Sequence, residues 1–189
     1  MKLVHLVVLI MAPLTVCALE SNDPKVEATR RISMELGKTL KGRLLQAVEQ
    51  QGVTGAVEIC AVVAPGIAEE LSKRNGALVR RVSLRTRNPA NQPDEWERNK
   101  LEAAAAALGQ TNSVRMTESY ASLPNEQCEN EVRYLRYIYM EPLCLTCHGS
   151  VLSPEMEEII KRRYPGDRAI GYAVDELRGA ISVRYPAAQ

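Results

Sequence analysis

The sequence is poor in aromatic residues and histidine, and it carries almost no net charge. Phenylalanine is absent, tryptophan occurs once, and the 189 residues include two histidines. The 24 Lys and Arg residues are balanced by 23 Asp and Glu residues, so the chain has no strong positive field and we exclude nucleic acid as a partner. An apolar share of 46% and a charged share of 25% are ordinary for a globular chain and exclude disordered, collagen-like and coiled-coil classes.

The N-terminus has the pattern of a targeting segment. Residues 3–18 are mostly apolar, follow Lys2 and end at the small residue Ala18. This run is short for a membrane span and fits a secretory signal peptide that is cleaved after Ala18. We therefore expect a signal peptide (1–18), a single domain (19–189), a periplasmic location and no stable membrane span after processing. An uncleaved N-terminal membrane anchor facing the periplasm is the alternative.

Hydrophobic spacing predicts one α+β domain. Apolar residues recur every three to four positions over residues 26–51 and indicate a long helix that Gly52 ends. Further helices are expected over residues 65–71, 95–108 and 154–163. Strands are expected over residues 78–84, 113–116, 132–139, 169–174 and 179–185. The last two strands would form a hairpin, and helices followed by antiparallel strands are typical of the α+β class.

The segment Cys144-Leu145-Thr146-Cys147-His148 has the C-x-x-C-H pattern of c-type haem attachment. At this spacing two thiols add to the two vinyl groups of one haem, and the adjacent imidazole lies under the iron as its proximal ligand. The attachment takes place outside the cytoplasm, which agrees with the signal peptide. We therefore predict one covalently bound haem c, attached through Cys144 and Cys147, with His148 as an iron ligand.

Three other interpretations of the motif stay open. A thioredoxin-like C-x-x-C would need a strand before it and a helix after it, whereas Pro142 precedes this motif and Gly149 follows it. A zinc site could combine the motif with Cys60 or Cys128. A structural disulfide between Cys144 and Cys147 is the third interpretation.

The second iron ligand cannot be another histidine of the mature chain, because His5 lies in the signal peptide. Cys60, in the apolar segment 57–64, is a candidate, although an inert buried thiol and a Cys60–Cys128 disulfide are alternatives. Methionine sulfur is also a possible ligand, but helical Met residues more often pack in the core. The candidate methionines are Met34, Met116, Met140 and Met156.

Several segments together carry a resemblance to a known family. They include EIC at residues 58–60, RRVSLRTRNPANQPDEWE at 80–97, YMEPLCLTCHG at 139–149, YPGDRAIGY at 164–172 and LRGAISV at 177–183. The sequence resembles the PAS-like periplasmic c-type haem domains over most of the mature chain. The resemblance implies a PAS-like antiparallel sheet with a long N-terminal helix and additional helices, and a haem ligated by His148 and Cys60. Residues 173–176 depart from it, since a glycine is expected near that turn.

Cationic and aromatic side chains complete the expected cofactor site. Arginine pairs well with the carboxylates of haem, and aromatic rings pack against the porphyrin. We expect cofactor contacts from Arg85, Arg87 and Tyr139. Further candidates are Arg80, Arg81, Trp96 and Arg178. A solvated strand face is the alternative for the arginines at positions 80–87, and core packing without haem contact is the alternative for Trp96 and Tyr139.

The expected function is redox or ligand sensing by a single haem. A thiolate ligand favours Fe(III) and hence a low reduction potential. Release of Cys60 on reduction would open a coordination position, and an unchanged ligand set after full reduction would contradict this hypothesis. The alternative is a periplasmic electron-transfer cytochrome, and an enzyme is not expected because no second histidine serves as an acid–base group. The expected partners are the c-type cytochrome maturation machinery and a redox or signalling partner that the sequence does not identify.

Overall fold

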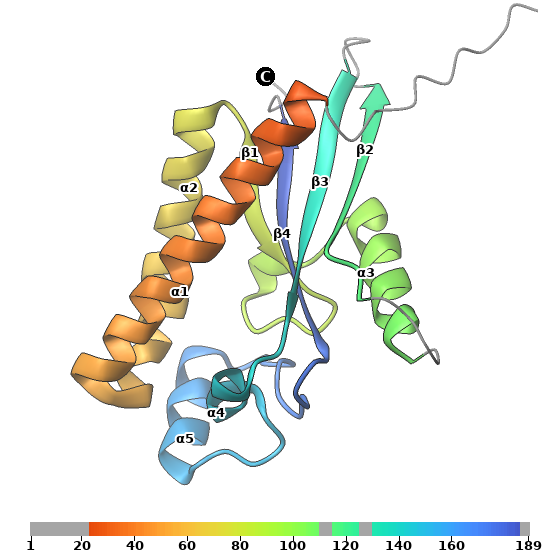
Figure 1. The fold of residues 1–189 in the computed structure, drawn as a ribbon. Helices are drawn as coiled ribbons and strands as arrows, with labels where there is room; N and C mark the ends of the chain where they lie inside the picture. The colour runs from red at the N-terminus through yellow and green to blue at the C-terminus, as the bar shows by residue number, and fades with distance from the viewer. Residues whose placement is uncertain (1–22, 110–114, 125–129, 186–189) are drawn as a thin grey trace, which may run out of the picture.

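One antiparallel sheet forms the centre of the protein (Figure 1). The computed structural model describes residues 23–109, 115–124 and 130–185. The strands lie in the order β1-β4-β3-β2, and each neighbouring pair is antiparallel. Their bounds are Leu78–Val82 for β1, Glu118–Pro124 for β2, Asn130–Tyr139 for β3 and Leu177–Tyr185 for β4. The expected α+β class and antiparallel sheet are therefore confirmed.

A long helical run precedes the sheet, as the apolar spacing predicts. Helix α1 (Pro24–Glu58) begins at Asp23, whose side chain accepts a hydrogen bond from the Lys25 amide at 2.7 Å. Gly52 has φ 73° and ψ 179°, a backbone that suits glycine, and it kinks the run before helical turns resume. A π-helical turn (Ile59–Val63) follows and leads into α2 (Ala64–Asn75). Gly52 thus interrupts the helix at the expected place without ending it.

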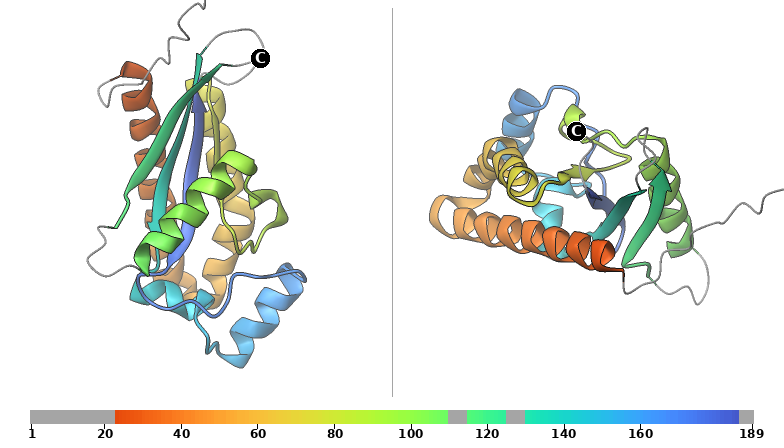
Figure 2. Two further views of the ribbon diagram at one scale, coloured as in Figure 1. Left: turned by 90° about the vertical axis from the view of Figure 1, so that its right-hand side faces the viewer. Right: turned by 90° about the horizontal axis from the view of Figure 1, so that it is seen from above.

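Helices cover both faces of the sheet, which Figure 2 shows from the side and from above. Alternate residues of a strand point to opposite faces, so β4 contributes to two separate clusters. Ile181 and Val183 pack with Leu36 of α1 and Leu71 of α2. On the other face, Ala180 packs with α3 (Glu95–Leu108). The sheet is therefore a partition between two hydrophobic cores.

One end of the sheet carries the remaining helices, a 3-10 turn at Pro142–Cys144, α4 (Leu145–His148) and α5 (Pro154–Arg163) (Figure 1). The strands approach one another closely there. Gly179 has φ 153°, and a Cβ at this position would lie 2.2 Å from the Val82 carbonyl oxygen. Only glycine fits this approach, which brings the start of β4 against the end of β1.

Two strand predictions are wrong. Residues 169–174 form an irregular segment and no hairpin with β4, because Gly171 and Asp175 adopt positive φ values of 73° and 69°. Asp175 therefore takes the backbone conformation for which a glycine was expected. The strand expected over residues 113–116 lies partly outside the described residues, and the strand that forms is β2. The expected signal peptide (1–18) and Cys128 also lie outside the described residues.

Candidate cofactor site

The C-x-x-C-H segment forms a single tight turn at the end of the sheet. β3 ends at Tyr139, and the motif occupies the 3-10 turn and α4. The Cys144 amide donates to the Glu141 carbonyl at 2.9 Å, and the Gly149 amide donates to the Leu145 carbonyl at 2.8 Å. These bonds hold both cysteines and the histidine on one short helical turn.

The local structure bears on the three other interpretations of the motif. Cys144 and Cys147 are free thiols. The helix that follows the first cysteine has four residues, unlike the long helix that a thioredoxin motif begins. Among the described residues, no group of three or more His, Cys, Asp or Glu side chains is arranged to hold a metal ion. Zinc ligation or a disulfide through Cys128 falls outside the described residues.

His148 is held in one orientation by the backbone of the segment at residues 169–172. Its Nδ1 lies 2.6 Å from the Ala169 carbonyl oxygen, so Nδ1 carries the proton and donates, and Nε2 keeps its lone pair. The Tyr172 amide donates to the His148 carbonyl at 2.9 Å, and the Gly171 amide donates to the Gly149 carbonyl at 2.9 Å. The segment that resembled a strand therefore pairs with the motif instead of with β4.

The surroundings of His148 favour a neutral imidazole. Burial lowers the pKa of His148 to about 3, and the positive charges of Arg178 and Arg87 act in the same direction. The ring of Tyr172 meets the imidazole edge-on, with 6.3 Å between the ring centres. A neutral imidazole with a free Nε2 is the form that binds a metal.

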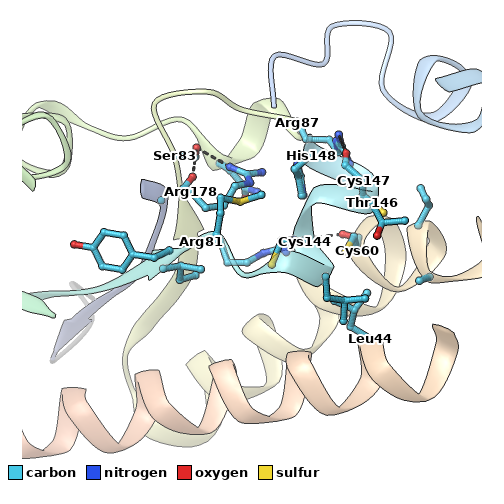
Figure 3. Close-up of a pocket in the computed structure, with 18 of the residues that line it drawn as sticks. Leu44, Cys60, Arg81, Ser83, Arg87, Cys144, Thr146, Cys147, His148 and Arg178 are labelled. Atoms are coloured by element: carbon cyan, nitrogen blue, oxygen red, sulfur yellow. Dashed lines mark hydrogen bonds between the residues drawn. The ribbon is translucent and has the colours of Figure 1, made fainter. Parts of the chain in front are cut away.

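Cys60 lies on the π-helical turn between α1 and α2, on the same cavity as the motif (Figure 3). Such turns are rare and are frequently found at functional sites. The Arg81 guanidinium donates to the Cys60 carbonyl at 3.3 Å, which ties the turn to β1. The chain thus brings the Cys60 thiol to the same cavity as the His148 ring, although 88 residues separate them in sequence.

Two adjoining cavities open between α1, the sheet and the motif. The first, of about 220 Å³, is lined by His148, both motif cysteines and Cys60. The second, of about 570 Å³, shares Cys60 and Cys144 with the first. Apolar side chains dominate both linings, which is typical of sites for organic cofactors. They include Leu44, Val48, Val57 and Ile138 in the first cavity and Leu40, Leu45 and Ile59 in the second.

The arginines divide between the cavities and the rest of the protein. Arg81, Arg87 and Arg178 line the first cavity. Arg80 points to the opposite face of β1 and pairs with Glu97 at 2.7 Å. Arg85 lines neither cavity, because its guanidinium lies over the Tyr172 ring at 4.1 Å from the ring centre. Of the two arginines predicted to contact a cofactor, Arg87 lines the first cavity, and Arg85 lines neither.

The aromatic and sulfur-containing candidates also lie in different parts of the protein. Tyr139 lines both cavities, and its hydroxyl donates to the Met116 carbonyl at 2.6 Å. Trp96 lies on α3, on the other side of the sheet, under the Arg133 guanidinium. Met34 is 55% exposed on α1, contrary to the core position expected for it, whereas Met156 is buried as expected. Met140 is buried and lines both cavities from the strand side of the motif.

One helical run passes a composition test for a membrane span. Within Pro24–Asn75 a window is long and apolar enough to cross a bilayer by length and composition alone. Core helices of soluble proteins satisfy the same test, and this run carries the Gly52 kink and the π-helical turn. The finding is therefore weak evidence for a membrane span.

Comparisons with known proteins agree with this fold. A model of the Tll0287-like family matches residues 19–186. Among solved structures, the chain is similar to the crystal structure of the cyanobacterial heme-protein Tll0287, with a TM-score of 0.69 and 24% sequence identity. The match covers 89% of this chain and 98% of that chain, and at this identity it shows the fold alone. No curated protein matches the sequence.

Proposed function

Because the match over residues 19–186 shows that this chain belongs to the Tll0287-like family, we propose that it is a single-haem c-type protein that senses redox state or a ligand. The structurally similar Tll0287 is described as a cyanobacterial heme-protein, which supports a haem in the same fold. One observation carries the proposal. The Ala169 carbonyl fixes His148 through Nδ1, so that Nε2 is available at a cavity that both motif thiols also line.

The residues of the cavity fit a haem. The lining is apolar, as a porphyrin requires, and it contains two thiols and one imidazole at the spacing of covalent attachment. The Nε of Arg87 is buried and has no hydrogen-bond partner among the described residues. A buried donor without a partner is costly, so this atom favours an acceptor such as a haem carboxylate beside it.

A bound haem would supply a one-electron iron couple. In this proposal Cys144 and Cys147 would hold the porphyrin through thioether bonds, and His148 would donate Nε2 to the iron. The Ala169 carbonyl keeps the imidazole in the required tautomer and prevents its rotation. The segment at residues 169–172 therefore acts as a positioning element for the proximal ligand.

Cys60 is the proposed second axial ligand. It is the one cysteine of the first cavity that the attachment motif does not use. Arg81 holds the Cys60 carbonyl, so the thiol sits on a turn that is anchored to the sheet and not on a free loop. A thiolate ligand would keep the reduction potential low.

The proposed role is that of a periplasmic sensor component, and no catalytic role is proposed. The maturation machinery of c-type cytochromes would attach the haem after export, and a redox or signalling partner would receive the output. A periplasmic electron-transfer cytochrome is the second candidate. Retention of Cys60 on the iron through reduction and reoxidation would favour electron transfer, whereas its release would favour sensing.

The test is expression of the full chain with a c-type maturation system, followed by absorption spectra of the oxidised and reduced protein. We expect a Soret band that stays with the chain after denaturation and acid extraction. Cys144→Ser/Cys147→Ser should lose this covalent band. A wild-type chain without covalent haem would overturn the proposal.

Cys60→Ala tests the second ligand in the same spectra. We expect covalent haem to be retained, while the oxidised Soret band shifts and the signature of thiolate ligation is lost. The matched control is Met140→Leu, a sulfur-containing side chain on the same cavity that we do not propose as a ligand. A Cys60→Ala spectrum identical to that of the wild type would contradict the assignment.

A further inference from the structure

Three guanidinium groups line the first cavity, those of Arg81, Arg87 and Arg178. They come from different places, because Arg81 lies one residue before the end of β1, Arg87 lies in the following loop and Arg178 is the second residue of β4. Figure 3 shows Arg178 and Ser83 on the side of the sheet, and Cys60, Cys147 and Thr146 on the side of the helices. Arg178 thus lies away from the thiols, whereas Arg81 and Arg87 bond to the Cys60 and Cys147 carbonyls beside them.

The three arginines have too few acidic partners. Among the described residues, Asp167 is the one carboxylate paired with any of the three, at 3.0 Å from Arg87. Arg178 bonds only to oxygen atoms that carry no charge, the Ser83 hydroxyl at 2.7 Å and the Arg85 carbonyl at 3.3 Å. Arg81 bonds to the Cys60 carbonyl. Two positive charges therefore face the cavity without an anion.

Arg81 and Arg178 are half-buried. Cations that are partly removed from water without a partner are costly, and a fold retains them where a ligand supplies the missing charge. The two carboxylate side chains of one haem match the two unpaired charges in number and sign. Guanidinium forks also match carboxylates in geometry. The porphyrin carries its carboxylates on the edge away from its vinyl groups, in agreement with the place of Arg178 away from Cys60 and Cys147 (Figure 3).

This inference rests on the proposed haem binding and deepens it. We propose that Arg178 and Arg81, with Arg87 beside them, bind the two haem carboxylates, and that Arg178 is the residue that raises the reduction potential against the thiolate. Residue Arg85, favoured by sequence alone, has no part in this role.

The backbone around Arg178 is built to place its side chain. Gly179, the next residue, permits the close approach of β4 to the Val82 carbonyl. Ser83 lies at this crossing, with its hydroxyl 2.7 Å from the Arg178 carbonyl and 2.7 Å from the Arg178 guanidinium. Burial lowers the pKa of Arg178, which reflects the cost of its charge in the absence of an anion. The side chain is thus fixed at the cavity and cannot swing to solvent without losing these bonds.

The test compares Arg178→Gln with Arg85→Gln in the haem-loaded protein. Removing a fixed positive charge near the iron favours Fe(III), because the oxidised iron carries more positive charge. At a fixed potential we expect the ratio of reduced to oxidised protein to fall about tenfold in Arg178→Gln, which equals a shift of ~59 mV for a one-electron couple. Arg85→Gln should leave the ratio within about twofold of the wild type. Equal ratios in the two variants would overturn the proposal.

Resonance Raman spectra separate direct contact from a charge that acts at a distance. The bending band of the haem carboxylates should shift in Arg178→Gln and Arg81→Gln and stay unchanged in Arg85→Gln. Arg178→Lys should recover most of the potential but not the band, because lysine lacks the planar fork. A shifted potential with an unchanged band in both Gln variants would overturn the carboxylate contact.

Three outcomes can be told apart: a variant that does not fold, a wild-type chain that binds no haem, and a haem that Arg178 and Arg81 do not contact. If Arg178→Gln does not accumulate, Arg81→Gln and Arg178→Lys carry the same two measurements. A wild-type chain without covalent haem would overturn the proposed function itself. Covalent haem with a potential and band insensitive to Arg178 and Arg81 would overturn this inference alone.

Discussion

The two faces of the sheet hold two arginine clusters that differ in how their charge is balanced. On the α3 face, Arg80 pairs with Glu97 at 2.7 Å, and Arg184 pairs with Glu131 at 3.1 Å. Arg133 pairs with Asp94 in the same cluster. On the other face, Arg178 and Arg81 have no carboxylate partner among the described residues, and Arg87 pairs with Asp167. A balanced cluster completes the fold, whereas an unbalanced one points to a ligand.

The two clusters also differ at the single donor that each leaves unpaired. The Nε atoms of Arg133 and Arg87 are both buried without a hydrogen bond. The Arg133 Nε still lies 4.0 Å from the Glu131 carboxylate, so its charge is compensated. The Arg87 guanidinium pairs with Asp167 through another nitrogen, and the residue also lines the cavity. Each cluster has one unpaired Nε atom, so the number of such atoms does not distinguish a packing role from a binding role. The surroundings of the atom distinguish the two roles.

Removing the central carboxylate of the balanced cluster should have the largest effect on stability. Glu97 is 1% exposed and accepts hydrogen bonds from Arg80 and Ser182. In Glu97→Ala we expect the free energy of unfolding to fall by about 3 kcal/mol, because buried cations lose their partner. Urea unfolding of the haem-loaded protein at neutral pH measures this change.

Glu95→Ala, on the exposed side of the same helix, is the control and should change stability by less than about 0.5 kcal/mol. The haem spectrum should not respond to Glu97→Ala, since Glu97 lies across the sheet from the cavity. A spectral change of the size seen in Cys60→Ala would show that the two faces are not independent.

The second prediction concerns Arg87, which has a carboxylate partner in Asp167 and also lines the first cavity. Its guanidinium donates to the Cys147 carbonyl at 2.6 Å, to Asp167 at 3.0 Å and to the Ala169 carbonyl at 3.3 Å. Arg87→Met should cost about 2 kcal/mol in stability, because it leaves a buried carboxylate and two carbonyls unsatisfied. Thermal unfolding of the haem-loaded protein checks the loss.

Arg87→Met should also alter the proximal ligand, because the same guanidinium joins the motif to the segment that holds His148. We expect a shifted iron–histidine band in the resonance Raman spectrum of the reduced protein. Arg163→Met, at an exposed pair with Glu58, should change neither quantity. Lost stability with an unchanged band would assign Arg87 to packing alone.

The sequence could predict the features that depend on local chemistry. The motif, the amphipathic helix and the Gly52 break follow from spacing and backbone preference. The alternation of Ile170, Tyr172 and Val174 is typical of a strand, although residues 169–174 form none. Gly171, with its positive φ, and the bonds to His148 and Gly149 decide the outcome there, and both depend on tertiary structure.

The division of the arginines could not be predicted for the same reason. Strand alternation separates Arg80 from Arg81, but it does not say which face holds the cavity. Arg85 lies two residues before Arg87 in a loop, where no periodicity fixes direction. The place of Arg178 at the cavity depends on the close approach at Gly179, which brings β4 against β1. A glycine beside an arginine at the start of a strand was the one local signal for it.

The smallest effect is expected at the Arg30–Glu118 pair, whose charges are balanced but whose side chains are partly exposed. Glu118 of β2 accepts from Arg30 at 2.6 Å and from the buried Tyr134 hydroxyl at 2.8 Å, and its side chain is 25% exposed. The Arg30 hydrogen bond holds the pKa of Glu118 below its ordinary value. A carboxylate with a lowered folded pKa stabilises the fold above its unfolded pKa of about 4.3, and this stability is lost as the pH falls through the folded pKa.

Glu118→Gln should therefore cost less than about 1 kcal/mol at pH 7, and the difference from the wild type should shrink as the pH falls below 4. Urea unfolding at pH 7, 5, 4 and 3 measures both. Glu69→Gln, at an exposed pair on α2, is the control and should show a smaller pH dependence. If the difference in unfolding free energy between Glu118→Gln and the wild type stays constant across this pH range, the packing of the side chain and not its charge sets its contribution to stability. The partly buried Arg30–Glu118 pair would then differ from both arginine clusters, because charge balance would not set its contribution to stability.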